Sequence, residues 1–373
     1  MTVQPFRIDI PDRELTELRD RLAGARWAAQ PPGAEGDGVS VARVRELAGY
    51  WRERYDWRVW EARLNAYPQF ITTIDGTSVH FLHIRSGRPD ALPLVLLHGW
   101  PGSIAEYLDV IGPLTDPDRP GPPFDLVIPS LPGFGFSGPT PDTGWGPRRI
   151  AQAIATLMQR LGYRRYGAVG NDWGSFIAPE LGRAAPDAVI GVHVTQIFSP
   201  PDGESSYLPP TVDPPGLTEL SKADQDALQG WRYYQRHLAS YYHVHAQQPA
   251  TLGHALADSP VGLLGWNCQV MTDLDVEMLL THVSVHWFTG TGGSAIRIYA
   301  EQERQPPPDR PSSVPLGLAN FAADLPAIRR YAERDHRNIV SWHTYDRGGH
   351  YAARQVPELL VADVRGFFAA LLG

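Results

Sequence analysis

Hydrophobic residues change their spacing along this chain. From Phe70 onward, short apolar runs alternate with segments of helical periodicity, which predicts strands alternating with helices. The first two runs are half-polar, as at an antiparallel edge, whereas the later runs are continuously apolar, as in a buried parallel sheet. The expected strands are 70–74, 79–84, 92–98, 124–129, 166–170, 189–197, 314–319 and 338–345. The pattern predicts an α/β fold with an eight-stranded, mostly parallel sheet flanked by helices.

Two segments interrupt this alternation. The first 67 residues carry four tryptophans and two helical patterns, and we expect them to form an N-terminal arm that packs on the core. Residues 200–305 are rich in His, Tyr, Trp and Gln, and we interpret them as a helical lid over the carboxyl edge of the sheet, where ligands bind. The expected divisions are 1–67 for the arm, 68–199 and 306–373 for the core, and 200–305 for the lid. Helices are expected near 12–22, 41–54, 221–246, 275–288 and 356–372, and after residues 103, 148 and 174.

Composition and charge exclude several classes of protein. The 33 basic and 41 acidic residues give a net charge of −8 with no long basic run, which argues against nucleic acid or an anionic membrane as partner. The single cysteine, Cys268, excludes an internal disulfide framework. The chain shows neither an apolar run of the roughly 18 residues that span a membrane nor a secretion signal. We therefore expect a soluble cytoplasmic protein, and homo-oligomerisation stays open.

The segment Gly-Asn-Asp-Trp-Gly at 170–174 carries the strongest chemical signal. It follows a predicted strand, opens a predicted helix, and matches the nucleophile elbow of α/β-hydrolases with Asp172 in the nucleophile's place. A carboxylate attacks saturated carbon that bears a leaving group, as in epoxides and alkyl halides, and forms an alkyl ester. No Gly-x-Ser-x-Gly occurs, which argues against an esterase or peptidase. The alternative is that Asp172 only caps the helix.

Three further positions complete this pattern. The loop His-Gly-Trp-Pro-Gly at 98–102 follows the third strand, so the backbone N–H groups of Trp100 and Trp173 are the expected oxyanion hole. His350 follows the last strand and is the expected base. The acid that orients it is expected to be Asp324, after the seventh strand. The alternative acids are Glu301, Glu303, Asp309 and Asp335.

Together these segments resemble the microsomal-type epoxide hydrolases, a family within the α/β-hydrolase superfamily. The resemblance covers nearly the whole chain, and it extends to Pro-Phe-Arg-Ile at 5–8, the lid segment 255–263 and Arg-Gly-Gly-His at 347–350. It implies an enzyme that converts an epoxide to a vicinal diol through an ester on Asp172, without cofactor or metal. The family's membrane anchor has no counterpart here, so a soluble, bacterial-like member is expected.

The resemblance also implies two lid tyrosines that donate hydrogen bonds to the epoxide oxygen. The run Arg-Ile-Tyr-Ala-Glu resembles the motif of the second and points to Tyr299. The run Ser-Tyr-Tyr-His-Val-His resembles the motif Gly-Tyr-x-x-Ile-Gln of the first and points to Tyr241. It departs from that motif at Ser240 and at His245, which leaves Tyr242 as a rival and suggests an altered pocket.

Other functions stay open on the sequence. A haloalkane dehalogenase uses the same triad, and the indole of Trp173 would suit a halide, but the two lid tyrosines argue against it. A non-catalytic α/β-hydrolase used for binding conflicts with the intact set of nucleophile, acid and base. Two histidine pairs, 243/245 and 282/286, lack the Glu of a zinc motif, so we expect no metal. The aromatic residues of 200–300 favour a bulky apolar or aromatic epoxide, in detoxification or secondary metabolism.

Overall fold

The computed structural model describes residues 2–34, 36–199 and 220–373, and its centre is a mixed sheet. The nine strands lie in the order β1-β2-β3-β5-β4-β6-β7-β8-β9. The pairs β1–β2, β2–β3 and β3–β5 are antiparallel, and all the others are parallel. The strands are β1 (Gln4–Phe6), β2 (Gln69–Ile74), β3 (Thr77–Ile84), β4 (Leu92–Leu97), β5 (Phe124–Pro129), β6 (Tyr166–Gly170), β7 (Val189–Val194), β8 (Leu316–Asn320) and β9 (Ile339–Thr344).

The sheet therefore has one strand more than the eight expected. β1 is a three-residue edge strand that pairs with β2, placing Pro5 opposite Phe70. A run this short shows no periodicity, and proline is a poor strand former that is tolerated at a sheet edge, where its missing N–H is not needed. The other eight strands lie where the hydrophobic pattern predicts them, although β7 ends three residues earlier than expected.

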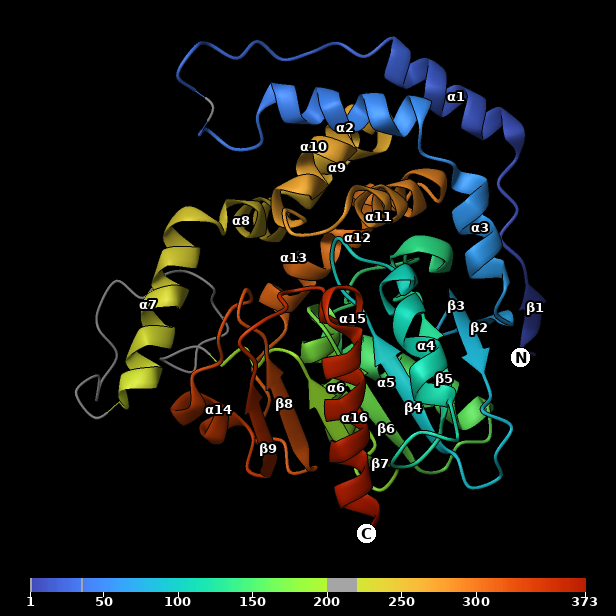
Figure 1. Cartoon of the computed structure of the whole chain (residues 1–373), viewed down its shortest axis with the longest axis vertical. Coiled ribbons are helices and arrows are strands. Elements are labelled where there is room, and N and C mark those ends of the chain that lie inside the picture. Colours follow the sequence, from blue (N-terminus) through green and yellow to red (C-terminus); the bar gives the residue numbers. More distant parts are fainter. Residues whose placement is uncertain (1, 35, 200–219) are drawn as a thin grey trace.

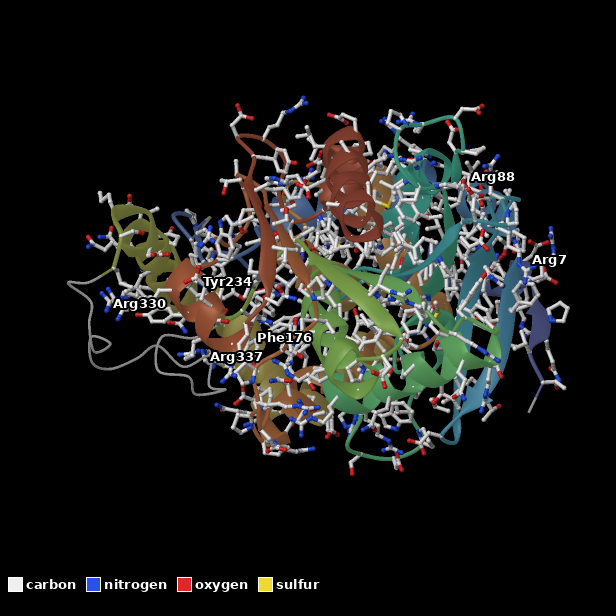
Figure 2. All side chains as sticks on the ribbon, turned by 90° about the horizontal axis from the view of Figure 1, so that it is seen from below. Arg7, Arg88, Phe176, Tyr234, Arg330 and Arg337 are labelled. Atoms are coloured by element: carbon white, nitrogen blue, oxygen red, sulfur yellow. The ribbon has the colours of Figure 1, made fainter. Side chains whose placement is uncertain are left out.

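Helices cover both faces of the sheet. α4 (Leu108–Thr115) packs with α16 (Pro357–Leu372), and α5 (Pro147–Arg160) packs with α6 (Trp173–Ala184). Figure 2 shows α16 on one side of the sheet and the green helices α5 and α6 on the other. Because both faces are covered, β6 is buried at all five positions, which explains its continuous apolar run. Two short helices lie nearer the carboxyl end of the chain. They are α14 (Arg329–Asp335) and α15 (Ala352–Gln355).

Seven helices, which we call the lid helices, lie beyond the carboxyl edge of the sheet (Figure 1). They are α7 (Lys222–His237), α8 (Ser240–Gln247), α9 (Pro249–Asp258), α10 (Pro260–Asn267), α11 (Val276–Phe288), α12 (Gly292–Ala295) and α13 (Arg297–Arg304). The single helix expected over 221–246 is in fact two, because the chain turns between α7 and α8 at Leu238 and Ala239. Part of the expected lid segment, residues 200–219, lies outside the described residues.

The N-terminal arm lies across the lid helices, on the side away from the sheet (Figure 1). It contains α1 (Asp12–Ala23), α2 (Val41–Glu53) and α3 (Trp57–Asn65), and the third of these was not expected from the sequence. The Asp56 carboxylate caps α3 by accepting the backbone N–H of Arg58. The domain boundaries expected from the sequence stay a prediction. In the described part of the chain, no helix has the length and apolar character to cross a membrane.

A carboxylate of α11 fastens the arm to the lid helices. Tyr50 donates its hydroxyl to Oε1 of Glu277 at 2.7 Å, and the indole of Trp60 donates to Oε2 at 2.9 Å. The indole of Trp51 donates to the hydroxyl of Ser284 at 2.9 Å, about two helical turns further along α11. Trp51 and Trp60 are both buried. These polar contacts fix the tryptophans that the hydrophobic effect brings into the interface.

We expect Glu277→Gln to destabilise the protein, because the amide carries no charge and keeps only one of the two oxygens that bind Tyr50 and Trp60. Because hydrogen bonds to a charged group contribute about 1.5–3 kcal/mol each, weakening two of them should cost about 1–3 kcal/mol of the free energy of unfolding. The control is Glu17→Gln, which removes an exposed ion pair with Arg21 and is expected to cost less than about 1 kcal/mol. Urea unfolding of both variants measures this difference. Equal stabilities would contradict the role given to Glu277.

Candidate active site

Asp172 follows Asn171 in the two-residue turn between the end of β6 and the start of α6, and its backbone conformation is strained. Its φ is 52° and its ψ is −122°. A non-glycine residue with positive φ costs on the order of 1–3 kcal/mol, and such residues cluster at active sites. A Cβ atom at Gly174 would lie 1.8 Å from the carbonyl oxygen of Leu97. The turn therefore requires glycine there, and it lifts the Asp172 side chain above the sheet.

The carboxylate of Asp172 lies against the loop that follows β4. The backbone N–H of Trp100 donates to its Oδ1 at 2.7 Å. The N–H of Trp173 also bonds to this carboxylate. A Cβ at Gly99 would lie 1.8 Å from the same oxygen, so only glycine allows this close approach. The two N–H groups expected to form an oxyanion hole thus meet at one carboxylate, whose other oxygen is 3.6 Å from Nε2 of His350.

His350 lies between two carboxylates. Its Nδ1 is 3.2 Å from Oδ1 of Asp324, while its Nε2 faces Asp172. The amide of Gln196 donates to Oδ2 of Asp324, and its Oε1 accepts the backbone N–H of Asp172 at 2.8 Å. Gln196 therefore links the loop of the acid to the elbow. It was not expected from the sequence, because a glutamine just after a strand carries no signal of its own.

Of the five candidate acids named from the sequence, Asp324 is the one that contacts His350. The four alternatives have other surroundings. Glu301 accepts the N–H of Gly144, Glu303 accepts the hydroxyl of Tyr242, Asp335 pairs with Arg334, and Asp309 lines a separate pocket.

A third carboxylate lies close behind the elbow. Glu106, in the short 3₁₀ turn Ile104–Tyr107, is buried, and its Oε1 accepts the amide of Asn171 at 2.8 Å. Burial raises the pKa of Glu106 to about 8, despite that hydrogen bond and the nearby charge of His350. Glu106 is therefore mostly protonated at neutral pH. No sequence motif singled it out, since the loop residues before it carry the recognisable pattern.

Two of the predicted tyrosines face the elbow from the lid helices. The ring of Tyr241 stacks on Trp100 with centroids 5.2 Å apart and an interplanar angle of 23°. Tyr299 meets Trp173 edge to face at 4.7 Å, and its ring centroid is 6.1 Å from that of Tyr241. The hydroxyl of Tyr241 is 2.6 Å from that of Tyr234, a residue the sequence did not suggest.

The neighbouring positions of α8 have other partners. The hydroxyl of Tyr242 donates to Oε1 of Glu303 at 2.6 Å. His245, which stands where the family motif has Gln, accepts the indole N–H of Trp266 at 2.7 Å and packs edge to face on Trp100 at 4.5 Å. Burial lowers the pKa of His245 to about 3, so its ring is neutral. The substitution thus adds an uncharged ring behind the aromatic pair of Trp100 and Tyr241.

Comparison with known proteins identifies the family to which this chain is related. Residues 3–107 match the family model described as the epoxide hydrolase N terminus, and residues 93–252 match that of the alpha/beta hydrolase fold. The chain is 30% identical to epoxide hydrolase 1 of Sus scrofa, over 99% of this chain and 89% of that one.

The solved structure of an Aspergillus niger epoxide hydrolase superposes with a TM-score of 0.86 at 30% identity, covering 100% of this chain and 97% of that one. The juvenile hormone epoxide hydrolase of Bombyx mori superposes with a TM-score of 0.85 at 25% identity, over 100% and 95% of the two chains. The chain belongs to the epoxide hydrolase family. The α/β-hydrolase fold and the family that the motifs predicted are thereby confirmed.

In this epoxide hydrolase, the carboxylates of the site work against burial to keep His350 charged. Burial lowers the pKa of His350, but the charge and hydrogen bond of Asp324 and the charge of Asp172 outweigh it and raise that pKa to about 10. Burial raises the pKa of Asp172 above its ordinary value, while the charge of His350 and the two backbone N–H groups oppose this. The side chains of His350 and Asp172 are only 25% and 18% exposed. An ion pair between them is therefore only weakly screened by solvent.

The site opens into a cavity of about 1040 Å³. Its walls come from all parts of the chain: Val39 and Leu47 from the arm, Phe176 from α6, and Leu279 from α11. Among the described residues, no group of three or more His, Cys, Asp or Glu side chains is arranged to hold a metal ion. Of the two histidine pairs noted in the sequence, His282 and His286 hydrogen-bond Ser103 and Thr291, and His245 accepts the indole N–H of Trp266.

We expect Asp172→Asn to lower the pKa of His350 from about 10, because the variant removes a negative charge 3.6 Å from Nε2 without changing the shape of the side chain. An NMR titration of imidazole-labelled protein measures this. The exposed Asp90→Asn, in the loop before β4, is the control and should leave the titration of His350 unchanged. An unchanged pKa in Asp172→Asn would contradict the coupling between the two groups.

Proposed function

We propose that this protein converts an epoxide to a vicinal diol in two steps, through a covalent ester on Asp172. The observation that carries the proposal is the position of that carboxylate. It projects from a strained elbow into a large cavity, with the backbone N–H of Trp100 on one oxygen and His350 3.6 Å from the other. A buried carboxylate of this kind, rather than a serine, suits attack on saturated carbon. The membership of the family supports the epoxide as the group attacked.

In the first step, ionised Asp172 attacks one epoxide carbon, and the C–O bond to that carbon breaks. The negative charge moves from the carboxylate to the departing oxygen, which stays attached through the other carbon. Tyr241 and Tyr299 donate hydrogen bonds to this oxygen as it becomes an alkoxide. An alkoxide is a poor leaving group, so donors at this position lower the barrier most.

In the second step, a water molecule attacks the carbonyl carbon of the ester. The ester is neutral, so the charge of Asp172 no longer raises the pKa of His350, and His350 gives up its proton, which neutralises the negative charge formed on opening the epoxide. Neutral His350 then takes a proton from the water, while Asp324 holds the ring in place. The N–H groups of Trp100 and Trp173, which already bind the carboxylate, stabilise the oxyanion. The intermediate then collapses: the bond from its carbonyl carbon to the substrate-bound oxygen breaks, and that oxygen takes up the remaining proton of the attacking water. The diol leaves, with Asp172 ionised and His350 protonated as at the start.

The cavity supports a bulky apolar or aromatic substrate. Its volume of about 1040 Å³ is at the upper end of the range typical of small-molecule sites. Aromatic side chains, including Trp100 and Phe176, form much of its wall. Location in the cytoplasm, homo-oligomerisation and a role in detoxification or secondary metabolism stay predictions from the sequence.

A haloalkane dehalogenase would use the same nucleophile, base and acid. The two tyrosines that face the elbow favour the epoxide, because a halide leaves without a proton donor, and the family relationship favours it as well. Assay of halide release beside diol formation separates the two functions.

We expect His350→Gln to stop the reaction after its first step. Alkylation needs only ionised Asp172 and the two tyrosines, whereas hydrolysis needs the base. Intact-mass spectrometry after incubation with styrene oxide should therefore show the protein plus one substrate mass.

Two further variants test whether the added mass is the ester on Asp172. The exposed His254→Gln is the control and should turn over without accumulating ester. Adding Asp172→Asn to His350→Gln should abolish the mass increase. An adduct that persists in this double variant, or an unmodified His350→Gln protein, would contradict the proposed mechanism.

A further inference from the structure

Tyr234 lies within hydrogen-bond distance of a tyrosine proposed to act on the epoxide. It comes from α7, on the side of that helix that faces the sheet (Figure 2), and it lines the cavity together with Tyr241. Its hydroxyl oxygen is 2.6 Å from that of Tyr241, and either oxygen can be the donor. Its ring also packs edge to face near Trp231 of the same helix, at 6.3 Å. The two proposed steps do not use the hydroxyl of Tyr234.

The direction of this hydrogen bond is fixed by the number of protons. A phenol has one proton to donate and can also accept. If Tyr241 donates to the epoxide oxygen, it has no proton left for Tyr234. The contact at 2.6 Å can then persist only if Tyr234 is the donor. Substrate binding thus sets the order Tyr234 to Tyr241 to epoxide oxygen.

We propose that Tyr234 is a positioning residue for epoxide opening, which donates its proton to the oxygen of Tyr241 and thereby directs the proton of Tyr241 toward the epoxide. The proposal rests on the function proposed above. When the epoxide C–O bond breaks, the alkoxide takes the proton of Tyr241, and the negative charge comes to rest on the Tyr241 oxygen. Tyr234 holds that charge through its hydrogen bond. The proton that His350 releases before it activates water neutralises Tyr241, and the proton that His350 then takes from water restores His350 itself, so protons and charge balance.

The surroundings of Tyr241 explain why a hydrogen-bond donor is needed beside its hydroxyl oxygen. Tyr241 lies against Trp100 and near Tyr299, in a wall of rings that offers a phenolate little solvation. Burial raises the pKa of Tyr241 well above its ordinary value, and burial likewise raises the pKa of Tyr234 to about 12. A charge in such a place is stable only where a hydrogen-bond donor faces it. Tyr234 supplies a donor at the distance of a short, strong hydrogen bond.

The test is Tyr234→Phe, with single-turnover alkylation by styrene oxide followed by rapid quench. We expect alkylation to slow about tenfold, the value of one hydrogen bond to a developing charge, with ester hydrolysis unchanged. The control is Tyr331→Phe, which removes a hydroxyl from the cluster in which α14 packs on Trp231 of α7. It should leave the alkylation rate as it is in the wild type.

A double-mutant cycle separates this role from a merely structural one. Tyr234→Phe should slow alkylation in the Tyr299→Phe background by the same factor as in the wild type. In the Tyr241→Phe background it should have almost no further effect, because the hydroxyl it acts on is gone. An equal loss in both backgrounds would overturn the proposal, as would a larger loss in Tyr234→Phe than in Tyr241→Phe, which would make Tyr234 the direct donor.

A second variant covers the case in which Tyr234→Phe folds poorly. 3-Fluorotyrosine at position 234 keeps the shape of the side chain and is a stronger hydrogen-bond donor, so alkylation should become faster. Unchanged alkylation in this variant, or in a folded Tyr234→Phe, would contradict the role of Tyr234 while leaving the proposed function intact. A wild-type protein that forms neither ester nor diol with any of a panel of aromatic and aliphatic epoxides would instead contradict the proposed function itself.

Discussion

A carboxylate that must stay ionised in a largely buried place is the constraint on which the rest of this site depends. Burial raises the pKa of Asp172, so the protein has to supply what water no longer does. It supplies the N–H groups of Trp100 and Trp173 and the positive charge of His350. Each requires close approach, and the strained φ of Asp172 and the missing side chain at Gly99 allow it.

The same electrostatics give the two proposed steps their order. Before alkylation, the ion pair keeps Asp172 ionised and His350 protonated, so the nucleophile is ready and the base is not. Ester formation removes the negative charge from Asp172, and the pKa of His350 falls, so that His350 can release its proton and become a neutral base. The base therefore becomes active only once there is an ester to hydrolyse. Asp324 lies 3.2 Å from Nδ1 of His350 and holds the ring in place through both steps.

The sequence predicts the parts of this protein that repeat a strong local pattern. The buried strands β4 and β6 are continuous apolar runs, and the elbow combines two glycines with a charged residue at a strand-to-helix turn. β1 and α3 were not predicted, because β1 is too short to show a periodicity and the nine-residue α3 buries the charged Glu61 beside Trp57, Trp60 and Leu64. The break between α7 and α8 also has no glycine or proline to announce it.

The residues of the candidate site also differ in how well the sequence predicts them. Asp172, His350 and Asp324 lie at strand ends whose order along the chain predicts where they meet, and the structure brings them together. Gln196 and Tyr234 become visible only in three dimensions, because they lie in segments that carry no motif and reach Asp172 and Tyr241 only through the fold. Their roles depend on which hydrogen bonds burial leaves possible, and sequence spacing does not encode that.

The covalent ester on Asp172 is the central claim, and a single turnover in ¹⁸O-labelled water tests it most directly. With enzyme in excess over styrene oxide, the new oxygen of the diol should come from the Asp172 carboxylate, so the first diol formed should carry no label. The label should appear instead in the peptide that contains Asp172. A diol labelled in its first turnover, with an unlabelled Asp172 peptide, would mean that water attacks the epoxide directly and would contradict the account.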